Sequence, residues 1–203
     1  MKKMAVTAFL ILIAMLGFAS TSCAKNISFK SGMEIDFKDC DNKRVNPDGS
    51  DSVCVDVDRL EAMATVCIYN QASDKISQDN GFIKYRELPQ EGRDRISPLP
   101  DEALVYVEGS YGAVYELKRE EIGDFIVYEI DNTLCDASAT AEKRPAVCYV
   151  AALVPSKTAN APPAIFVSAI IEQPPSRGGK LDKKAENKVE SIKKIIESIR
   201  LGK

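Results

Sequence analysis

The sequence contains no histidine and no tryptophan among its 203 residues. Without an imidazole, the chain cannot use Ser-His or Cys-His nucleophilic catalysis, a histidine general base near neutral pH, or a zinc site that depends on histidine. Without tryptophan, an aromatic stacking surface must consist of tyrosine or phenylalanine. Paired carboxylates, a Ser-Lys pair and an oxygen-coordinated metal remain open to an enzyme with this composition.

The uncharged apolar run over residues 5–18 is short for a membrane-spanning helix, which needs about 20 residues. The run follows Lys2 and Lys3 and precedes the small residues of positions 19–24, which is the pattern of a secretory signal peptide. Cleavage after Ala24 leaves Lys25 as the first residue. We therefore expect a signal peptide over residues 1–24, a single globular domain over residues 25–203, and a periplasmic or secreted protein.

Cys23 leaves an alternative open, because a lipoprotein peptidase cuts directly before a cysteine. Ser20 stands where that peptidase usually finds leucine, whereas Thr21 and Ser22 suit it. Several acyl chains on Cys23 would anchor the protein firmly to the outer membrane, whereas one chain anchors only marginally. Under either cleavage the chain leaves the cytoplasm, and contact with a membrane is expected only if Cys23 is lipidated.

The mature chain is large enough for one domain with a real core. Removing 24 of 203 residues leaves 179, within the usual domain size of about 100–200 residues. The leader takes two lysines with it, so 25 basic side chains face 30 acidic ones and the net charge is −5. A net acidic domain is a poor candidate for binding nucleic acid, which requires a basic face.

Five cysteines remain after the leader, and in an oxidising compartment most of them should pair. Cys40 and Cys54 flank a turn-rich stretch, and so do Cys135 and Cys148. We predict these two pairs as disulfides that link the arms of hairpins. Cys67 lies in an apolar run and is predicted to be a buried free thiol. Other pairings of the five cysteines remain open.

Alternating and continuous apolar patterns predict many short strands. Alternation marks the stretches MEIDF, VCVDV, FIKYREL and DFIVYEI. Continuous apolar runs, which indicate central strands covered on both faces, mark MATVCIY, ALVYV, AVCYVAALV and AIFVSAII. A short helix over VDRLEAMATV is an open alternative. Turn sequences such as Asn80-Gly81 separate the runs.

The last segment, residues 181–201, predicts a long amphipathic helix. Its apolar residues recur at helical spacing and form one stripe: Leu181, Ala185, Val189, Ile192, Ile195, Ile196 and Ile199. Asp182 can cap its start and Gly202 can close its end. The stripe needs a partner surface, so the fold class is predicted as α+β, a meandering antiparallel sheet with this helix packed on one face.

This order of elements, two apolar strands followed by a terminal helix, resembles the end of Mog1/PsbP-like domains. The likeness covers roughly the last 60 residues and rests on element order. It implies a small exported bacterial domain with that fold.

Two stretches imitate ligand-binding motifs but depart from them. The stretch EGSYGAVYEL, Glu108–Leu117, resembles a kinase glycine-rich loop, yet Val107 stands in place of the first glycine and the companion motifs are missing. We expect a hairpin turn there. The acidic stretch from Asp39 has Arg44 where a calcium loop needs glycine. We therefore expect no metal and no cofactor.

The stretch Leu88–Glu102 is long, polar and bounded by prolines, and we consider it either a flexible connection or a binding loop. The candidate partner-binding residues are its charged tip and a second acidic turn: Arg93, Asp94, Arg95, Asp48 and Asp51.

Export, disulfides and the missing catalytic motifs favour a non-enzymatic envelope protein that binds another protein. One concrete form is an immunity protein that inhibits a delivered toxin by occluding its active site. The alternatives are a carboxylate-based enzyme acting on the cell wall, and an envelope protein that binds a lipid or small ligand between helix and sheet.

Overall fold

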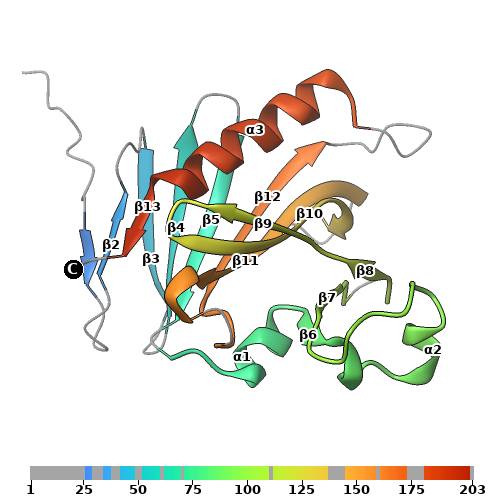
Figure 1. Ribbon diagram of the computed structural model, residues 1–203. Helices are drawn as coiled ribbons and strands as arrows, with labels where there is room; N and C mark the ends of the chain where they lie inside the picture. The colour runs from blue at the N-terminus through green and yellow to red at the C-terminus, as the bar shows by residue number, and fades with distance from the viewer. Residues whose placement is uncertain are drawn as a thin grey trace, which may run out of the picture.

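The computed structural model of the chain describes residues 26–28, 34–37, 42–48, 52–59, 62–69, 71–109, 112–136, 145–158, 161–172 and 181–201. They form an α+β fold in which antiparallel strands predominate and one long helix follows the last strand of the largest sheet (Figure 1).

The largest element is a seven-stranded antiparallel sheet with the order β3-β4-β5-β12-β11-β10-β9. Its strands are β3 (Asn42–Asp48), β4 (Ser52–Arg59), β5 (Ala62–Tyr69), β9 (Lys118–Ile122), β10 (Phe125–Asp136), β11 (Pro145–Pro155) and β12 (Ile165–Glu172). The order consists of two meanders, β3 to β5 and β9 to β12. The β5–β12 pair joins them into one sheet.

Two three-stranded sheets complete the strands of the described residues. The first, of order β1-β2-β13, consists of β1 (Asn26–Ser28), β2 (Glu34–Phe37) and β13 (Ile199–Leu201). The second, of order β6-β7-β8, consists of β6 (Phe82–Lys84), β7 (Leu104–Val107) and β8 (Val114–Glu116). The second lies within residues 71–117, which we call the inserted segment because it separates the two meanders.

Three helices and two short 3₁₀ turns accompany the strands in the described part of the chain. They are α1 (Asp74–Asp79), η1 (Tyr85–Glu87), α2 (Gln90–Arg93), η2 (Ser156–Thr158) and α3 (Lys183–Ser198). All but η2 and α3 belong to the inserted segment.

The innermost strands β5, β12 and β11 arise from three of the continuous apolar runs. From Ala146 to Val154 no residue of β11 is more than 9 % exposed, because both faces of this strand are covered. The prediction of central, doubly covered strands is thereby confirmed for this run. Residues 52–59 and 62–69 are strands, so the alternative of a helix over VDRLEAMATV is wrong.

Helix α3 covers one face of the large sheet, which we call the α3 face (Figure 1). Its stripe is formed by side chains that are 0–7 % exposed: Ala185, Val189, Ile192, Ile195 and Ile196. They pack against alternate residues of the strands, such as Val66, Ala151 and Val167. Each buried isoleucine contributes about 1.5–3 kcal/mol, so this contact is a main source of stability.

The ends of α3 confirm one prediction and correct another. The Asp182 carboxylate accepts a hydrogen bond from the Ala185 N–H at 2.7 Å, as expected for an N-cap. At the other end the helix stops at Ser198, and Ile199 begins strand β13 instead of continuing the stripe. The reason is that β13 pairs with β2, with Ile199 opposite Phe37. Gly202 lies outside the described residues.

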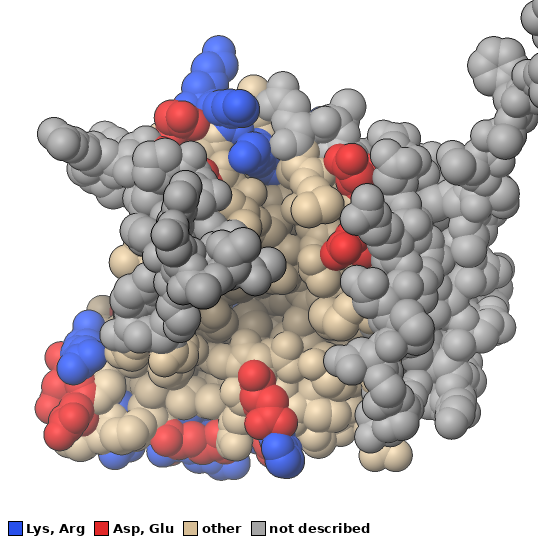
Figure 2. All heavy atoms as spheres, turned by 180° about the vertical axis from the view of Figure 1, so that it is seen from behind, with Lys and Arg blue, Asp and Glu red and all other residues tan. Residues whose placement is uncertain are grey.

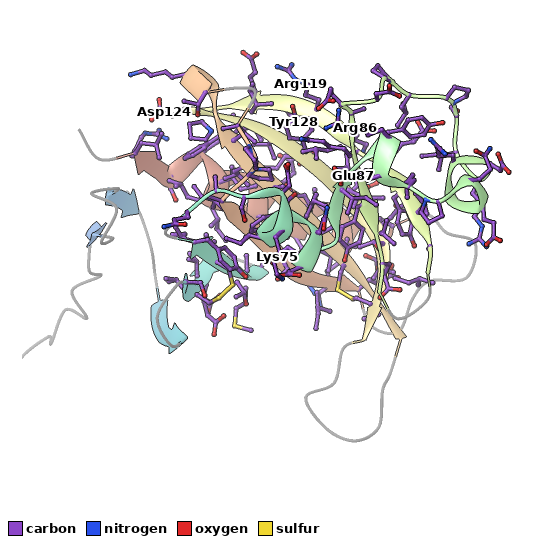
Figure 3. All side chains as sticks on the ribbon, turned by 90° about the horizontal axis from the view of Figure 1, so that it is seen from below. Lys75, Arg86, Glu87, Arg119, Asp124 and Tyr128 are labelled. Carbon is purple, nitrogen blue, oxygen red and sulfur yellow. A yellow bond between two sulfur atoms is a disulfide. The ribbon has the colours of Figure 1, made fainter. Side chains whose placement is uncertain are left out.

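The inserted segment covers part of the opposite face of the sheet. Its Phe82 ring lies 5.6 Å from the ring of Phe166, which projects from β12 away from α3. Val150 and Ala152 of β11 belong to the same cluster and alternate with the residues that contact α3. Seen from below, α1 with Lys75 and η1 with Arg86 and Glu87 extend across the sheet (Figure 3).

A buried carboxylate lies at the contact of α3 with the sheet. Glu129 of β10 is 2 % exposed and accepts hydrogen bonds from the Tyr149 hydroxyl at 2.6 Å and the Lys193 ammonium at 2.8 Å. Lys193 also donates to Glu120 of β9 at 2.7 Å. Both oxygens of the buried carboxylate are therefore satisfied, and the network links α3 to three strands.

The two disulfides of the described residues are Cys54–Cys67 and Cys135–Cys148. The second confirms the prediction. The predicted Cys40–Cys54 pair is wrong, and so is the predicted free thiol of Cys67. The predicted hairpin does form, but its register places Cys54 opposite Asn46 on β3 and directly opposite Cys67 on β5. Cys40 itself lies outside the described residues.

Disulfides of this kind are typical of proteins in an oxidising compartment. No helix among the described residues has the length and apolar character needed to span a membrane. Residues 1–24 and Cys23 lie outside the described part of the chain, so the signal peptide and its cleavage remain predictions.

The network under α3 predicts a loss of stability at alkaline pH. Burial, together with the charge and hydrogen bond of Glu129, raises the pKa of Tyr149 well above its usual value. Burial alone would lower the pKa of Lys193, but hydrogen bonds to Glu120 and Glu129 outweigh it and raise that pKa. Both groups keep their protons longer in the folded state, so their contribution is complete below about pH 10 and is lost as the pH rises further.

Urea unfolding at pH 7, 9 and 11 measures this loss. We expect the free energy of unfolding to fall between pH 9 and 11, and to fall less in Tyr149→Phe, which lacks the phenol. Tyr128→Phe is the matched control, because Tyr128 points from β10 to the opposite face and takes no part in the network. Equal alkaline slopes in all three proteins would contradict the assignment.

Candidate functional site

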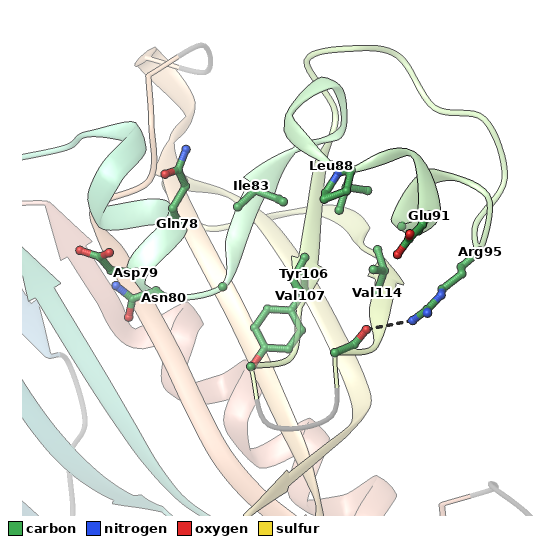
Figure 4. Close-up of a pocket in the computed structure, with 15 residues that line it drawn as sticks. Gln78, Asp79, Asn80, Ile83, Leu88, Glu91, Arg95, Tyr106, Val107 and Val114 are labelled. Atoms are coloured by element: carbon green, nitrogen blue, oxygen red, sulfur yellow. Dashed lines mark hydrogen bonds between the residues drawn. The ribbon is translucent and has the colours of Figure 1, made fainter.

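The inserted segment contains a cleft of about 830 Å³. One wall is the end of α1 with the turn that follows it, and the other is α2 (Figure 4). The sheet β6-β7-β8 forms the floor, where Ile83, Val107 and Val114 are half-buried. A volume of this size lies in the range of about 300–1,000 Å³ that is usual for ligand pockets.

The first wall depends on a turn that only glycine fits. Ser73 caps α1 by accepting from the Ile76 N–H at 3.1 Å, and the helix ends at the Asn80-Gly81 turn. Gly81 has a φ of 82°, and a Cβ there would lie 2.8 Å from both the Tyr106 ring and the Val107 carbonyl oxygen. The predicted Asn80-Gly81 turn is thus confirmed, and its glycine allows α1 to approach β7 closely.

The second wall rests on a buried leucine. Leu88 is 3 % exposed and precedes Pro89, the N-cap of α2. A Cβ on Gly92 would lie 3.3 Å from the Leu88 side chain and 3.6 Å from Val114, so glycine keeps α2 close to the floor. This part of the stretch 88–102 therefore forms a helical turn.

The glycine-rich stretch from Glu108 closes the lower end of the cleft. It connects β7 and β8 as an antiparallel hairpin, in which the Glu108 N–H donates to the Ala113 carbonyl at 2.9 Å. The prediction of a hairpin turn is confirmed. Residues 110 and 111 lie outside the described part. A Cβ on Gly109 would meet nothing within 4 Å, because this residue borders the open cleft.

The charged side chains of the cleft differ in whether they have a hydrogen-bond or ion-pair partner. Asp79 forms an exposed ion pair with Lys75 at 2.6 Å, and the Arg95 guanidinium donates to the Gly112 carbonyl at 3.2 Å. Glu91 has no hydrogen bond or ion pair within the described residues. Figure 4 shows Asp79 and Glu91 on opposite walls, with Arg95 turned down towards Gly112.

The predicted tip Arg93-Asp94-Arg95 lies at the end of α2 and directly after it, next to the cleft, and much of it is engaged within the fold. The Asp94 carboxylate accepts a hydrogen bond from the Gln90 amide at 2.7 Å, and the Arg95 guanidinium donates one to the Gly112 carbonyl. The Arg93 Nε atom is buried and has no hydrogen-bond partner among the described residues. Only Arg95 lines the cleft itself.

The structure does not bring the second predicted group to this site. Asp48 ends β3, at the opposite side of the molecule from α2 (Figure 1), and nothing is described of its side chain. Asp51 lies outside the described residues.

Residues 96–103 form an exposed loop that is held at both ends, which we call the braced loop. At its start the Ser97 N–H donates to the Glu116 carboxylate at 2.9 Å. At its end the Arg86 N–H donates to the Asp101 carbonyl at 3.2 Å, and Arg86 also forms an ion pair with Glu102. Between the braces, Pro98 and Pro100 are exposed and restrict the backbone.

A further hollow lies on the face of the molecule seen from behind, where uncharged side chains form the surface and charged ones stand around its margin (Figure 2). On the sheet face opposite α3, Met63 of β5 is 62 % exposed and Ile170 of β12 is 42 % exposed.

Comparison of the chain with protein-family models, with curated proteins and with solved structures found no match in any of the three. The resemblance to Mog1/PsbP-like domains therefore stays a prediction. Among the described residues, no group of three or more Cys, Asp or Glu side chains is placed to hold a metal ion.

Sequence reasoning missed the residues that build the cleft, although one signal was present. Asn80-Gly81 could be recognised as a turn, but the contact of that turn with Tyr106 joins residues 25 positions apart. Glu91 could not be distinguished from the other acidic residues of the stretch. Its position depends on α2, a single helical turn that has no apolar periodicity.

The close approach at Gly81 predicts that alanine destabilises the fold at this position but not at Gly109. Gly81→Ala places an alanine in the left-handed backbone region and brings its Cβ to 2.8 Å from two neighbouring atoms. We expect this substitution to lower the free energy of unfolding by about 2–4 kcal/mol. Gly109→Ala, on the same cleft, meets open space and should change it by less than about 0.5 kcal/mol. Urea titrations of both variants measure the difference, and similar losses in the two would contradict the described geometry.

Proposed function

We propose that this chain is an exported envelope protein that binds another protein and blocks it, as an immunity protein blocks a delivered toxin. The braced loop is the observation that supports this proposal. A loop that is exposed, restricted by two prolines and fixed at both ends has already lost the freedom that binding would otherwise remove. Such a loop suits insertion into the active-site groove of a partner.

Charged residues at the braced loop and at the adjoining cleft would orient a partner towards both surfaces. Asp101 and Glu102 near the end of the loop are exposed, and Arg95, directly before the loop, lines the cleft. A partner that contacts the braced loop therefore meets the cleft as a second, concave surface. The protein would act by occlusion, with a convex loop and an adjoining cleft on one side of the molecule.

The periplasm or the cell exterior is the expected place of action, in keeping with the two disulfides and the predicted leader. A lipidated Cys23 would tether the same binding surface to the outer membrane without changing it.

Co-expression tests the proposal. Toxin candidates encoded beside this gene are directed to the periplasm of a bacterial host, with and without this chain. We expect rescue of growth against one of them, and a stable complex of that toxin with the purified chain. Failure of every neighbouring candidate both to bind and to be neutralised would contradict the proposal.

Loosening the braced loop tests its role in the complex. In Pro98→Gly/Pro100→Gly, the free loop gains conformational freedom, and we expect the dissociation constant to rise by roughly 5–30-fold, or about 1–2 kcal/mol. Asn187→Gly is the control, because it introduces a glycine on the exposed side of α3, away from the loop. Equal affinities of the double variant and the control would exclude the loop from the interface.

A further inference from the structure

A groove of about 450 Å³ runs along the outer edge of the large sheet, between β9 and α3 (Figure 1). On one side it is lined by four consecutive residues of β9 and its turn, 120–123. Side chains of a strand alternate between its two faces, so contact with four residues in a row means that the groove borders the edge of the strand. The other side is lined by residues of α3 at helical spacing and by one residue of β13: Glu190, Lys193, Lys194, Glu197 and Arg200.

The edge of β9 presents main-chain groups to this groove. Strand β9 ends the order of the seven-stranded sheet, and among the described strands it pairs with β10 alone. The hairpin between them has a two-residue turn, with Ile122 opposite Phe125. In such a hairpin the flanking pair exchanges both main-chain hydrogen bonds, and bonded pairs then alternate along the ladder. The N–H and C=O groups of Glu120 therefore face β10, whereas those of Arg119 and Glu121 face the open edge.

The charged side chains of β9 are compensated within the protein. Charges on an edge strand usually hinder pairing with another chain. Here each charged residue of the strand has a partner of opposite sign, so a strand that joins this edge meets no uncompensated charge on β9. The pairs, with their N–O distances, are Lys118–Asp131 at 2.8 Å, Arg119–Glu121 at 3.8 Å and Lys193–Glu120 at 2.7 Å.

We propose that the groove binds an extended segment of a partner polypeptide, which joins the large sheet as an additional strand beside β9. The main chain of the segment bonds to the open N–H and C=O groups of Arg119 and Glu121, which is the mode of recognition by strand addition. This proposal goes beyond the proposed function and does not rest on it, because neither the braced loop nor the cleft of the inserted segment lines the groove.

The side chains of β9 give the segment a preferred order of charges. Residues directly opposite each other on paired strands share a face, where opposite charges are favourable. In an antiparallel segment, the residue opposite Glu121 comes first and should be basic, and the residue opposite Arg119 comes two positions later and should be acidic. The residue between them lies opposite Glu120 and points to the α3 face, where side chains of both signs line the groove. No charge is preferred at that position.

A second copy of this chain fits the edge less well than a separate segment. Antiparallel pairing of two β9 strands gives the same order of charges, because Arg119 of each copy then lies opposite Glu121 of the other. The same register sets the two Glu120 side chains directly opposite each other, and like charges in that position are destabilising. A partner segment with an uncharged middle residue avoids this repulsion.

A peptide titration followed by ¹H–¹⁵N NMR tests the proposal on the full chain. The probe is acetyl-Val-Lys-Thr-Glu-Val-amide, and the matched peptide exchanges its lysine and glutamate. In the free protein, we expect the amides of Arg119 and Glu121 to exchange with solvent faster than those of Glu120 and Ile122. The probe should shift the signals of β9 and slow exchange at Arg119 and Glu121 by about ten-fold at saturation. The matched peptide should bind about five-fold more weakly.

Variants assign the binding to the edge and to the groove. Glu121→Pro removes an N–H that faces the open edge and leaves the bonds to β10 in place, which is where edge strands accept proline. We expect it to abolish binding of the probe, whereas Glu121→Ala keeps the N–H and should weaken binding only about two- to three-fold. Glu190→Trp leaves β9 unchanged and should prevent binding by filling the groove. Lys184→Trp, on another side of α3, should bind like the wild type.

Three results would overturn the proposal. The first is that the probe leaves the β9 signals unchanged up to its solubility limit. The second is that the proline and alanine variants of Glu121 bind it alike, and the third is that Glu190→Trp binds it as Lys184→Trp does. Gel filtration of the protein alone tests the occupant. If the chain forms a dimer that Glu121→Pro separates, a second copy occupies the edge and the separate segment is wrong.

Discussion

The pairing of β5 with β12 is the constraint on which the rest of the structure depends. It sets Ser168 opposite Thr65 and joins the two meanders, although a long stretch of chain separates them. The Tyr69 N–H continues the junction by donating to the Ala164 carbonyl at 2.9 Å. Because α3 occupies one face of the joined sheet, the inserted segment must cross the other, and the cleft and the braced loop are built there.

The two faces are stabilised by different means. The α3 face has a continuous apolar core, and the buried carboxylate of Glu129 is satisfied there by Tyr149 and Lys193. Removing one partner from such a network costs more than the pair contributes, so the network fixes the position of α3. The opposite face has a smaller aromatic core around Phe82 and Phe166, which leaves the inserted segment its own polar walls. The proposed binding surface of the inserted segment is thereby separated from the elements that carry most of the stability.

Local patterns in the sequence were sufficient for the class of fold and insufficient for the site. The strands, the α3 stripe and the Asp182 cap follow from periodicity and capping rules that involve neighbouring residues. The Cys54–Cys67 bond depends on the register of β4 with β5, and the end of α3 depends on β13 pairing with β2. The first joins consecutive strands and was missed because a helix over part of them was left open, whereas the second joins segments far apart in the chain. The cleft depends on contacts such as that of Gly81 with Tyr106, for which no local pattern exists.

The central claim is that the proposed binding surface of the inserted segment is already ordered in the free protein. Backbone ¹⁵N relaxation measures this directly at the amides of Ser97, Leu99 and Asp101 in the braced loop. The account predicts order parameters of about 0.85, equal to those of β5 in the middle of the sheet. Values below about 0.6 at these amides would show a flexible loop and would contradict the account.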